Sequence, residues 1–84
     1  MSDINQLKRE LQVIIADTGT SAAARAAQIT NEIAPRYADL AGSDPLFDQI
    51  NDMAGQIVAS GATERENGVA WGEVVRLVHN MLDA

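Results

Sequence analysis

Apolar residues recur along the chain at intervals of three and four positions, the spacing that lines one face of an α-helix. Three breaks, at residues 17–20, 41–45 and 60–63, combine Gly with Ser, Thr or Asp and divide the pattern into four segments. No segment alternates apolar and polar residues with the period of two that a half-buried strand requires. The pattern therefore predicts an all-α fold, and its short connections favour a small four-helix up-down bundle forming a single domain, residues 1–84.

Each segment is expected to turn one apolar face toward a common core. In the first segment, Val13 falls on the opposite face, which suits contact with a second surface. The residues expected to face the core are Ile4, Leu7, Leu11, Ile14 and Ile15 in the first segment; Ala22, Ala26, Ile29, Ile33, Tyr37 and Leu40 in the second; Leu46, Phe47, Ile50, Met53, Ala54, Ile57 and Val58 in the third; and Ala70, Trp71, Val74, Val75, Leu77, Val78, Met81 and Leu82 in the fourth.

The first two helices have recognisable end and break signals. Ser2 or Asp3 is expected to cap the start of the first helix, and Gly19 is expected to end it. The second helix contains Pro35, which has no N–H to donate to the carbonyl of Asn31. We expect this helix to be kinked or broken near Pro35. A kink is favoured, because the apolar face continues in phase beyond the proline.

The last two helices also carry end signals. Ser43 is the expected N-cap of the third helix, and the charge of Asp44 suits the dipole at that end. Gly61 is expected to supply the left-handed residue that follows this helix. For the fourth helix, the pair Thr63–Glu66 matches a capping box, and Asn67 is the alternative cap, for a helix that starts at Gly68.

The composition indicates a folded protein with a small core. The chain has 84 residues, of which 46% are hydrophobic, and only one each of Phe, Tyr and Trp. A core of this size provides modest stability, and the chain has no cysteine for a disulfide or a thiolate metal site. Self-association is the remaining common source of stability, so a homo-oligomer, most simply a dimer, is expected.

The charge balance limits the classes of partner. The chain has twelve acidic and six basic residues, which gives a net charge of −6. Direct nucleic-acid binding and docking on anionic membranes both depend on cationic side chains, so both are disfavoured. The start, MSDINQLKRE, has charges where a secretion signal needs an apolar run, and no apolar stretch approaches the ~20 residues of a membrane span. A cytoplasmic protein with a basic protein partner is expected.

Aspartates form the strongest polar candidate for a partner-binding surface. Asp44, Asp48 and Asp52 recur every four residues and so stack on one face of the third helix, and Asp39 lies just before them. Like charges at this spacing cost about 0.2–0.5 kcal/mol per pair. The stripe is either a solvated face of the helix or a surface for a basic protein.

Small residues on the second helix form the candidate for self-association. Ala23, Ala27, Ala34 and Ala38 lie on a smooth face that lets another helix approach closely. This surface either packs within the bundle or joins two copies of the chain.

Two residues that occur once in the chain have simpler interpretations. Trp71 shares its spacing with Val74 and Val78, so it is expected in the core, and an exposed partner-binding tryptophan is the alternative. His79 lies at the edge of the same stripe, and no second histidine or cysteine exists to complete a metal site with it.

The sequence predicts neither an enzyme nor a cofactor. It has no glycine-rich phosphate loop, and nothing in it places a serine near His79 to make a catalytic triad. As an alternative to protein binding, Arg25, Arg36 and Tyr37 on the second helix are candidates for holding an anionic small ligand between helices or protomers.

A second alternative concerns Ser43, in the stretch AGSDPLF. A small, acidic, four-helix chain resembles an acyl carrier protein, a family in which a serine within an Asp-Ser-Leu motif opens the second helix and carries phosphopantetheine. The resemblance implies a carrier role for Ser43. However, Asp44 follows the serine here, and an alanine-rich helix replaces the family's long first loop. The chain is therefore not assigned to that family.

The expected function follows from the fold and the charge. We expect a non-enzymatic, self-associating interaction module of the inhibitor, immunity or scaffold type that binds a basic protein. This expectation rests on analogy with the class of small acidic helical proteins.

Overall fold

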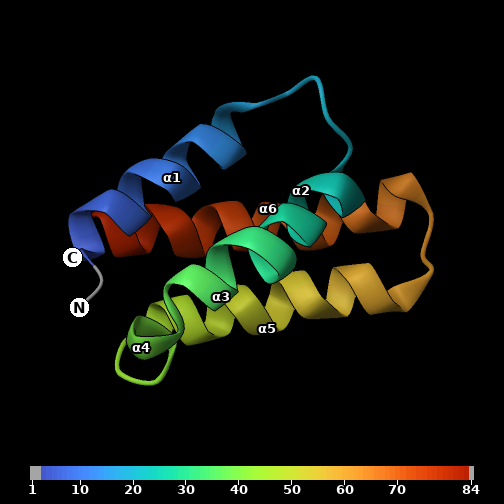
Figure 1. The fold of residues 1–84 in the computed structure, drawn as a ribbon. Helices are drawn as coiled ribbons and strands as arrows, with labels where there is room; N and C mark the ends of the chain where they lie inside the picture. The colour runs from blue at the N-terminus through green and yellow to red at the C-terminus, as the bar shows by residue number, and fades with distance from the viewer. Residues whose placement is uncertain (1–2, 84) are drawn as a thin grey trace.

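The chain forms helices and no strand within the part that the computed structural model describes, residues 3–83. The radius of gyration is 11.8 Å and the extents are 37 × 21 × 18 Å, as expected of a compact unit. None of the described helices is long and apolar enough to cross a membrane. The elements are α1 (Ile4–Ala16), α2 (Ala22–Gln28), the π-helical segment η1 (Ile29–Ile33), α3 (Ala34–Arg36), α4 (Ala38–Ala41), α5 (Pro45–Ser60) and α6 (Glu64–Asp83) (Figure 1).

Helix α1 begins as predicted and ends earlier than predicted. The Asn5 N–H donates to Asp3 Oδ1 at 2.9 Å, so Asp3 is the N-cap; Ser2 lies outside the described residues. At the other end, Asp17 and not Gly19 is the C-cap. The Asp17 carboxylate accepts from the Gly19 N–H at 3.0 Å and from the Thr20 hydroxyl at 2.7 Å, which closes a turn that contains the glycine.

The predicted second helix is divided into several pieces around Pro35. The π-helical turn η1 precedes the proline, and the Ala34 N–H bonds to the Ile29 carbonyl, five residues back. A wider turn of this kind relieves the crowding that a proline imposes on the carbonyls before it. The helix then continues past Pro35 to Arg36 and breaks at Tyr37, whose φ of −121° and ψ of 32° are not helical.

The connection between α5 and α6 follows the predicted signals. Gly61 has a φ of 63°, the left-handed conformation that glycine adopts without strain. Thr63 then stands directly before α6: its Oγ1 accepts from the Glu66 N–H at 3.2 Å, and its hydroxyl donates to Glu66 Oε1 at 2.9 Å. The alternative start at Gly68 is wrong, because Asn67 already lies within α6.

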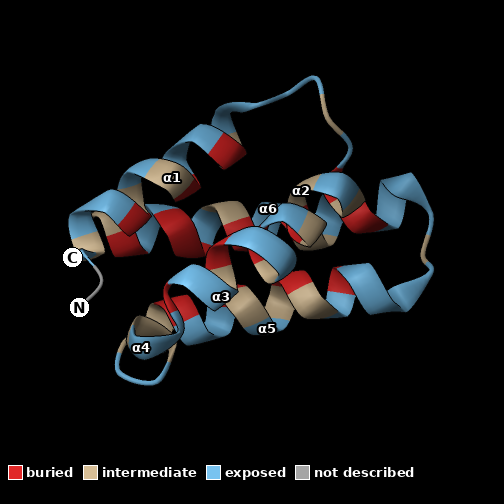
Figure 2. Cartoon of the chain, in the orientation of Figure 1, coloured by how far each residue is buried: buried red, intermediate tan, exposed pale blue. Residues whose placement is uncertain are grey.

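The core contains most of the predicted apolar residues, and Figure 2 shows the buried positions where helices face one another. Val58 is the exception, with 47% of its surface exposed. Val13 is 71% exposed, in agreement with its place opposite the apolar face of α1. The buried hydrophobic residues are Leu7, Leu11, Ile14, Ala22, Ala26, Ile29, Ile33, Tyr37, Phe47, Ile50, Ala54, Ile57, Trp71, Val74, Leu77, Val78 and Met81.

The helices pack around the pair α5 and α6, which is the most extensive helix contact among the described elements. Helix α2 packs against both members of this pair, whereas α1 lies on α6 and η1. The start of α1 and the end of α6 lie at the same end of the molecule (Figure 1).

Side-chain hydrogen bonds hold the loop between α1 and α2 and the start of α2 in place. The Ala22 N–H at the start of α2 donates to Glu64 Oε1 at 3.1 Å, which ties this helix to the start of α6. Arg25 Nη1 donates to the Asp17 carbonyl at 2.7 Å. These bonds hold α2 where it can cover both α5 and α6.

Candidate functional site

The first aspartate of the predicted stripe has a structural role. Asp44, and not Ser43, is the N-cap of α5: its Oδ1 accepts from the N–H groups of Leu46 at 3.0 Å and Phe47 at 3.2 Å. The Ser43 hydroxyl instead lies 3.4 Å from the Asp39 and Leu40 carbonyls, in the preceding turn. Because Pro45 takes the first helical position, the residue directly before it is the one whose side chain reaches the first N–H groups.

The other aspartates of the stripe are exposed. Asp48 lies in the first turn of α5 and Asp52 one turn further on, while Asp39 is exposed on α4. Asp52 also borders a hollow of about 200 Å³ between α5 and α6, together with Gln49, Met53, Glu73, Arg76 and Leu77. The acidic stripe of α5 therefore leads into the groove between the last two helices.

The hollow beside Asp52 has charged residues of both signs, namely Asp52, Glu73 and Arg76. Arg76 Nη2 lies 2.8 Å from Glu73 Oε2, and both side chains are more than half exposed. An exposed pair of this kind contributes little to stability. With Asp52 and Glu73 opposing one cation, this stretch keeps a net negative charge.

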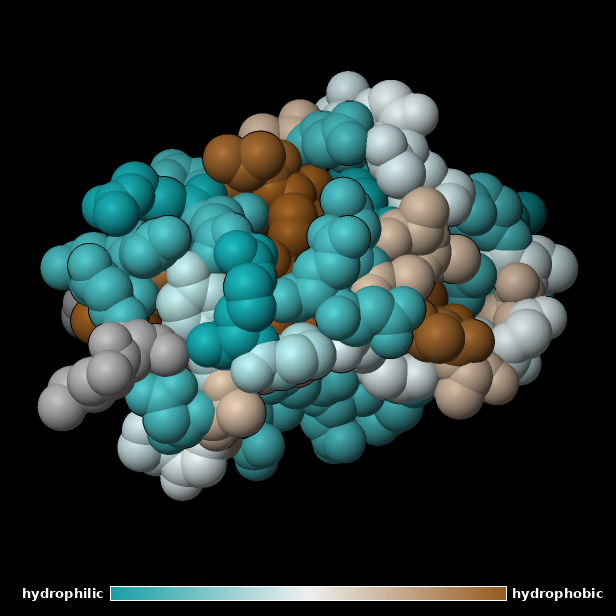
Figure 3. All heavy atoms as spheres, in the orientation of Figure 1, coloured by the Kyte–Doolittle hydropathy of each residue, from teal (hydrophilic) through white to brown (hydrophobic). Residues whose placement is uncertain are grey.

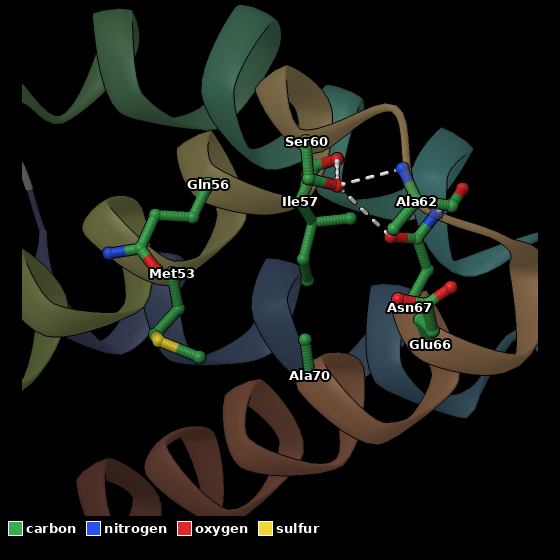
Figure 4. A pocket seen from close by; sticks show the side chains of 8 residues that line it. All are labelled: Met53, Gln56, Ile57, Ser60, Ala62, Glu66, Asn67 and Ala70. Carbon is green, nitrogen blue, oxygen red and sulfur yellow. Dashed lines mark hydrogen bonds between the residues drawn. The ribbon is translucent and has the colours of Figure 1, made fainter.

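A second hollow lies beside the first, and Met53 lines both. Its volume is about 180 Å³, and Figure 4 shows its lining: Met53, Gln56, Ile57, Ser60, Ala62, Glu66, Asn67 and Ala70. We call it the α5–α6 pocket. Its walls come from the second half of α5, the connecting loop and the first turns of α6.

Asn67 is the buried polar residue of this pocket, with 6% of its surface exposed. Its Oδ1 accepts from the Ser60 hydroxyl at 3.4 Å, and its Nδ2 donates to the Ala62 carbonyl at 3.4 Å. Asn67 is predicted from the capping signals only as an alternative cap, so this buried role is a new finding. Its distance of four residues from Trp71, in phase with the core stripe, is the signal that marks a buried polar side chain.

The predicted self-association surface is only partly exposed. Ala23, Ala27 and Ala34 are half-buried, and Ala38 is exposed on the separate short helix α4. Because the chain breaks at Tyr37, Ala38 does not continue the same helix face as the other three alanines. Ala27 lines a shallow hollow of about 260 Å³ with Ala24, Gln28, Asn31 and Glu32.

The structure brings Arg36 and Tyr37 together on Glu10 of α1. Arg36 Nη2 lies 2.5 Å from Glu10 Oε1, and the Tyr37 hydroxyl donates to Glu10 Oε2. The Tyr37 hydrogen bond lowers the pKa of the Glu10 carboxyl below its ordinary value; partial burial opposes this effect and Arg36 adds to it. The same bond, with burial, raises the pKa of Tyr37. Two of the three proposed anion-binding residues are thus engaged by a carboxylate.

Arg25 has a different environment from the other two. Its guanidinium carbon lies 4.9 Å from the centre of the Trp71 ring, a cation–π contact that joins α2 to α6. Trp71 is buried, with 5% of its surface exposed, so its predicted place in the core is confirmed. Arg25 Nε and Trp71 Nε1 are both buried and have no hydrogen-bond partner.

The other side chains that could bind a metal ion or act in catalysis do not form a cluster. His79 is exposed on α6. Within residues 3–83, no three His, Asp or Glu side chains gather closely enough to hold a metal ion.

The comparisons with known proteins add no family or fold relative. The chain matches no family model, no curated protein and no solved structure.

Proposed function

We propose that the protein is a non-enzymatic interaction module that binds a basic protein partner through the face formed by α5 and α6. One observation carries the proposal: Asp52 and Glu73 border a hollow whose lining also includes Met53, which is half-buried, and the buried Leu77. Carboxylates beside accessible apolar surface suit a partner that is both basic and amphipathic. The net charge of −6 favours encounter with such a partner at long range.

The stripe on α5 supports this assignment. Asp48 and Asp52 repel one another at their spacing of four residues, and no described ion pair neutralises either of them. A basic partner would remove that repulsion. Asp44 contributes less, because its carboxylate is engaged in capping α5.

The wider role that we propose is that of a small inhibitor, immunity-type or scaffold protein of the cytoplasm. We further propose an up-down four-helix bundle as the architecture, with α2, η1, α3 and α4 together taking the place of its second helix. Self-association through the alanine surface of α2 is part of the proposal. It is supported by Ala23 and Ala27, which are half-buried and leave a smooth surface beside a shallow hollow.

Affinity capture from lysate of the encoding organism, followed by mass spectrometry, tests the basic-partner proposal. We expect the wild type to enrich a basic protein, and Asp48→Asn with Asp52→Asn to weaken its binding about threefold to tenfold, because each exposed charge pair contributes up to ~1 kcal/mol. The matched control is Glu32→Gln with Asp17→Asn, which changes the net charge equally at positions on η1 and directly after α1, outside this face. Equal weakening by both double variants, or none by either, contradicts the proposal.

A further inference from the structure

The α5–α6 pocket has an apolar floor and a polar end. Met53, Ile57 and Ala70 supply the floor, and Figure 4 shows the side chains of Ile57 and Ala70 pointing toward each other. Ser60, Glu66 and Asn67 lie at the other end, where α5 and α6 are joined. A ligand that fits must therefore be apolar along its length and polar at its tip.

The polar end favours a cation. The residues that line the pocket include Glu66 and no lysine, arginine or histidine. Glu66 Oε1 accepts from the Thr63 hydroxyl at 2.9 Å, which fixes the orientation of the carboxylate. Asn67 Oδ1 is an amide oxygen with two acceptor positions, and its bond from Ser60 is long, at 3.4 Å. Two oxygen acceptors of this kind suit an ammonium or guanidinium group.

We propose that the α5–α6 pocket receives one lysine or arginine side chain of the basic partner. The methylene stem lies on Met53, Ile57 and Ala70, and the charged end reaches Glu66 and Asn67 Oδ1. Long cationic side chains commonly bury their stems on apolar surface while the charge stays at a polar edge. The inference rests on the proposed function, and it identifies the pocket as the place where the partner is anchored.

The surroundings of the pocket fit a partner segment with further basic residues. The hollow on the other side of Met53 carries Asp52 and Glu73, so a second cation of the same segment meets carboxylates there. Val69 is 75% exposed and lies three residues after Glu66 and four before Glu73, on the same side of α6. It provides apolar contact beside the charged groups, as an amphipathic partner requires.

The test uses three capped amino acids as probes in NMR titrations of the full-length, 15N-labelled protein: N-acetyl-lysine methylamide, N-acetyl-norleucine methylamide and N-acetyl-glutamate methylamide. The readouts are the backbone amide signals of Ala62 and Asn67 and the side-chain amide of Asn67. We expect the lysine probe to shift these signals saturably and to bind about fivefold more tightly than norleucine, which has a similar stem without the charge. The glutamate probe is expected to leave them unchanged.

Two variants and a control locate the binding. Glu66→Gln keeps an acceptor for Thr63 and removes the charge, so lysine binding should fall about fivefold, to the level of norleucine. Ala70→Leu should abolish binding of both probes by filling the floor, and circular dichroism checks that it folds. Glu32→Gln is the charge-matched control and should bind like the wild type.

Several outcomes overturn the inference. They are unshifted pocket signals at the highest soluble probe concentration, equal binding of lysine and norleucine, or equal weakening by Glu32→Gln and Glu66→Gln. The two proposals fail separately. If Asp48→Asn with Asp52→Asn loses the captured partner while Glu66→Gln and Ala70→Leu retain it, the pocket inference falls and the proposed function stands. If the lysine probe binds as expected and no captured partner depends on the aspartates, the preference of the pocket for a cationic side chain stands and the proposed function falls.

Discussion

Glu10 is the residue through which α1 is joined to the irregular region after η1. It accepts from Arg36 and from Tyr37, and its side chain is 27% exposed whereas that of Arg36 is 54% exposed. Tyr37 is buried at the point where the chain leaves the helix, so this bond fixes both a core side chain and a backbone break. Arg25 has the corresponding role at the other end of the α2 region, where it contacts Trp71.

At this scale, Glu10→Gln is expected to lower the free energy of unfolding at neutral pH by about 1 kcal/mol, because a charge-assisted bond becomes a neutral one in a partly exposed site. The measurement is urea unfolding followed by circular dichroism, and Asp52→Asn is the control with the same charge change. The folded state lowers the pKa of Glu10 below its ordinary value of 4.5. Its stabilising contribution is therefore complete above that pH and is lost as the pH falls through the lowered pKa.

The same variant has a spectroscopic consequence. The chain has a single tyrosine, so phenolate absorbance reports Tyr37 directly. Its pKa is raised from 10.0 by the bond to Glu10, and Glu10→Gln should move it back toward that value. An unchanged titration in the variant contradicts the Glu10–Tyr37 assignment.

Among the elements, the starts of α1, α2 and α5 depend on which side chain reaches the unsatisfied N–H groups of the first turn. Asp44 serves α5 in this way, and Thr63 serves α6. Each of these residues stands directly before the first residue of its helix. Its side-chain oxygen accepts a hydrogen bond from a backbone N–H two or three residues further along the chain. The break at Tyr37 has a different cause, because Pro35 and the wide turn before it change the course of the backbone.

Asp44→Ala should therefore destabilise the protein by about 1 kcal/mol, the usual effect of removing an N-cap. Asp44→Asn retains a capping oxygen and should change stability by only a few tenths of a kcal/mol. Ser43→Ala should have a similarly small effect, since its hydroxyl bonds are long. Chemical unfolding of the three variants measures this, and a loss for Ser43→Ala equal to that for Asp44→Ala would show that the cap is assigned to the wrong residue.

In the whole molecule, α5 and α6 form the centre. Helix α2 packs against both of them, α1 packs against α6, and η1 and α4 pack against α5. The surface is mostly hydrophilic in the view of Figure 3, with a hydrophobic patch near the end of α1. The acidic stripe and the pocket belong to α5 and α6, whereas the alanine surface belongs to α2, so binding of a partner and self-association can be tested separately.

Self-association is expected to depend on the alanine surface of α2. We expect light scattering after size exclusion to report a dimer for the wild type and a monomer for Ala27→Glu, which places a charge on the alanine surface. Val58→Glu is the matched control, because Val58 is 47% exposed on a different helix, and this variant should stay dimeric. A wild-type monomer at millimolar concentration contradicts the dimer, and monomers in both variants contradict its location.

The spacing of apolar residues predicted the all-α fold and most of the core, because an interval of three and four positions is a local property of an α-helix, but it did not predict the break at Tyr37. The sequence also predicted the left-handed Gly61 and the capping box of Thr63 with Glu66, because both depend on residues only a few positions apart. Only the tertiary structure placed Glu10 against Tyr37, which is 27 positions away, and brought Asn67 and Met53 into one pocket. These contacts depend on how the helices pack and rotate against one another, and helical periodicity does not specify that arrangement.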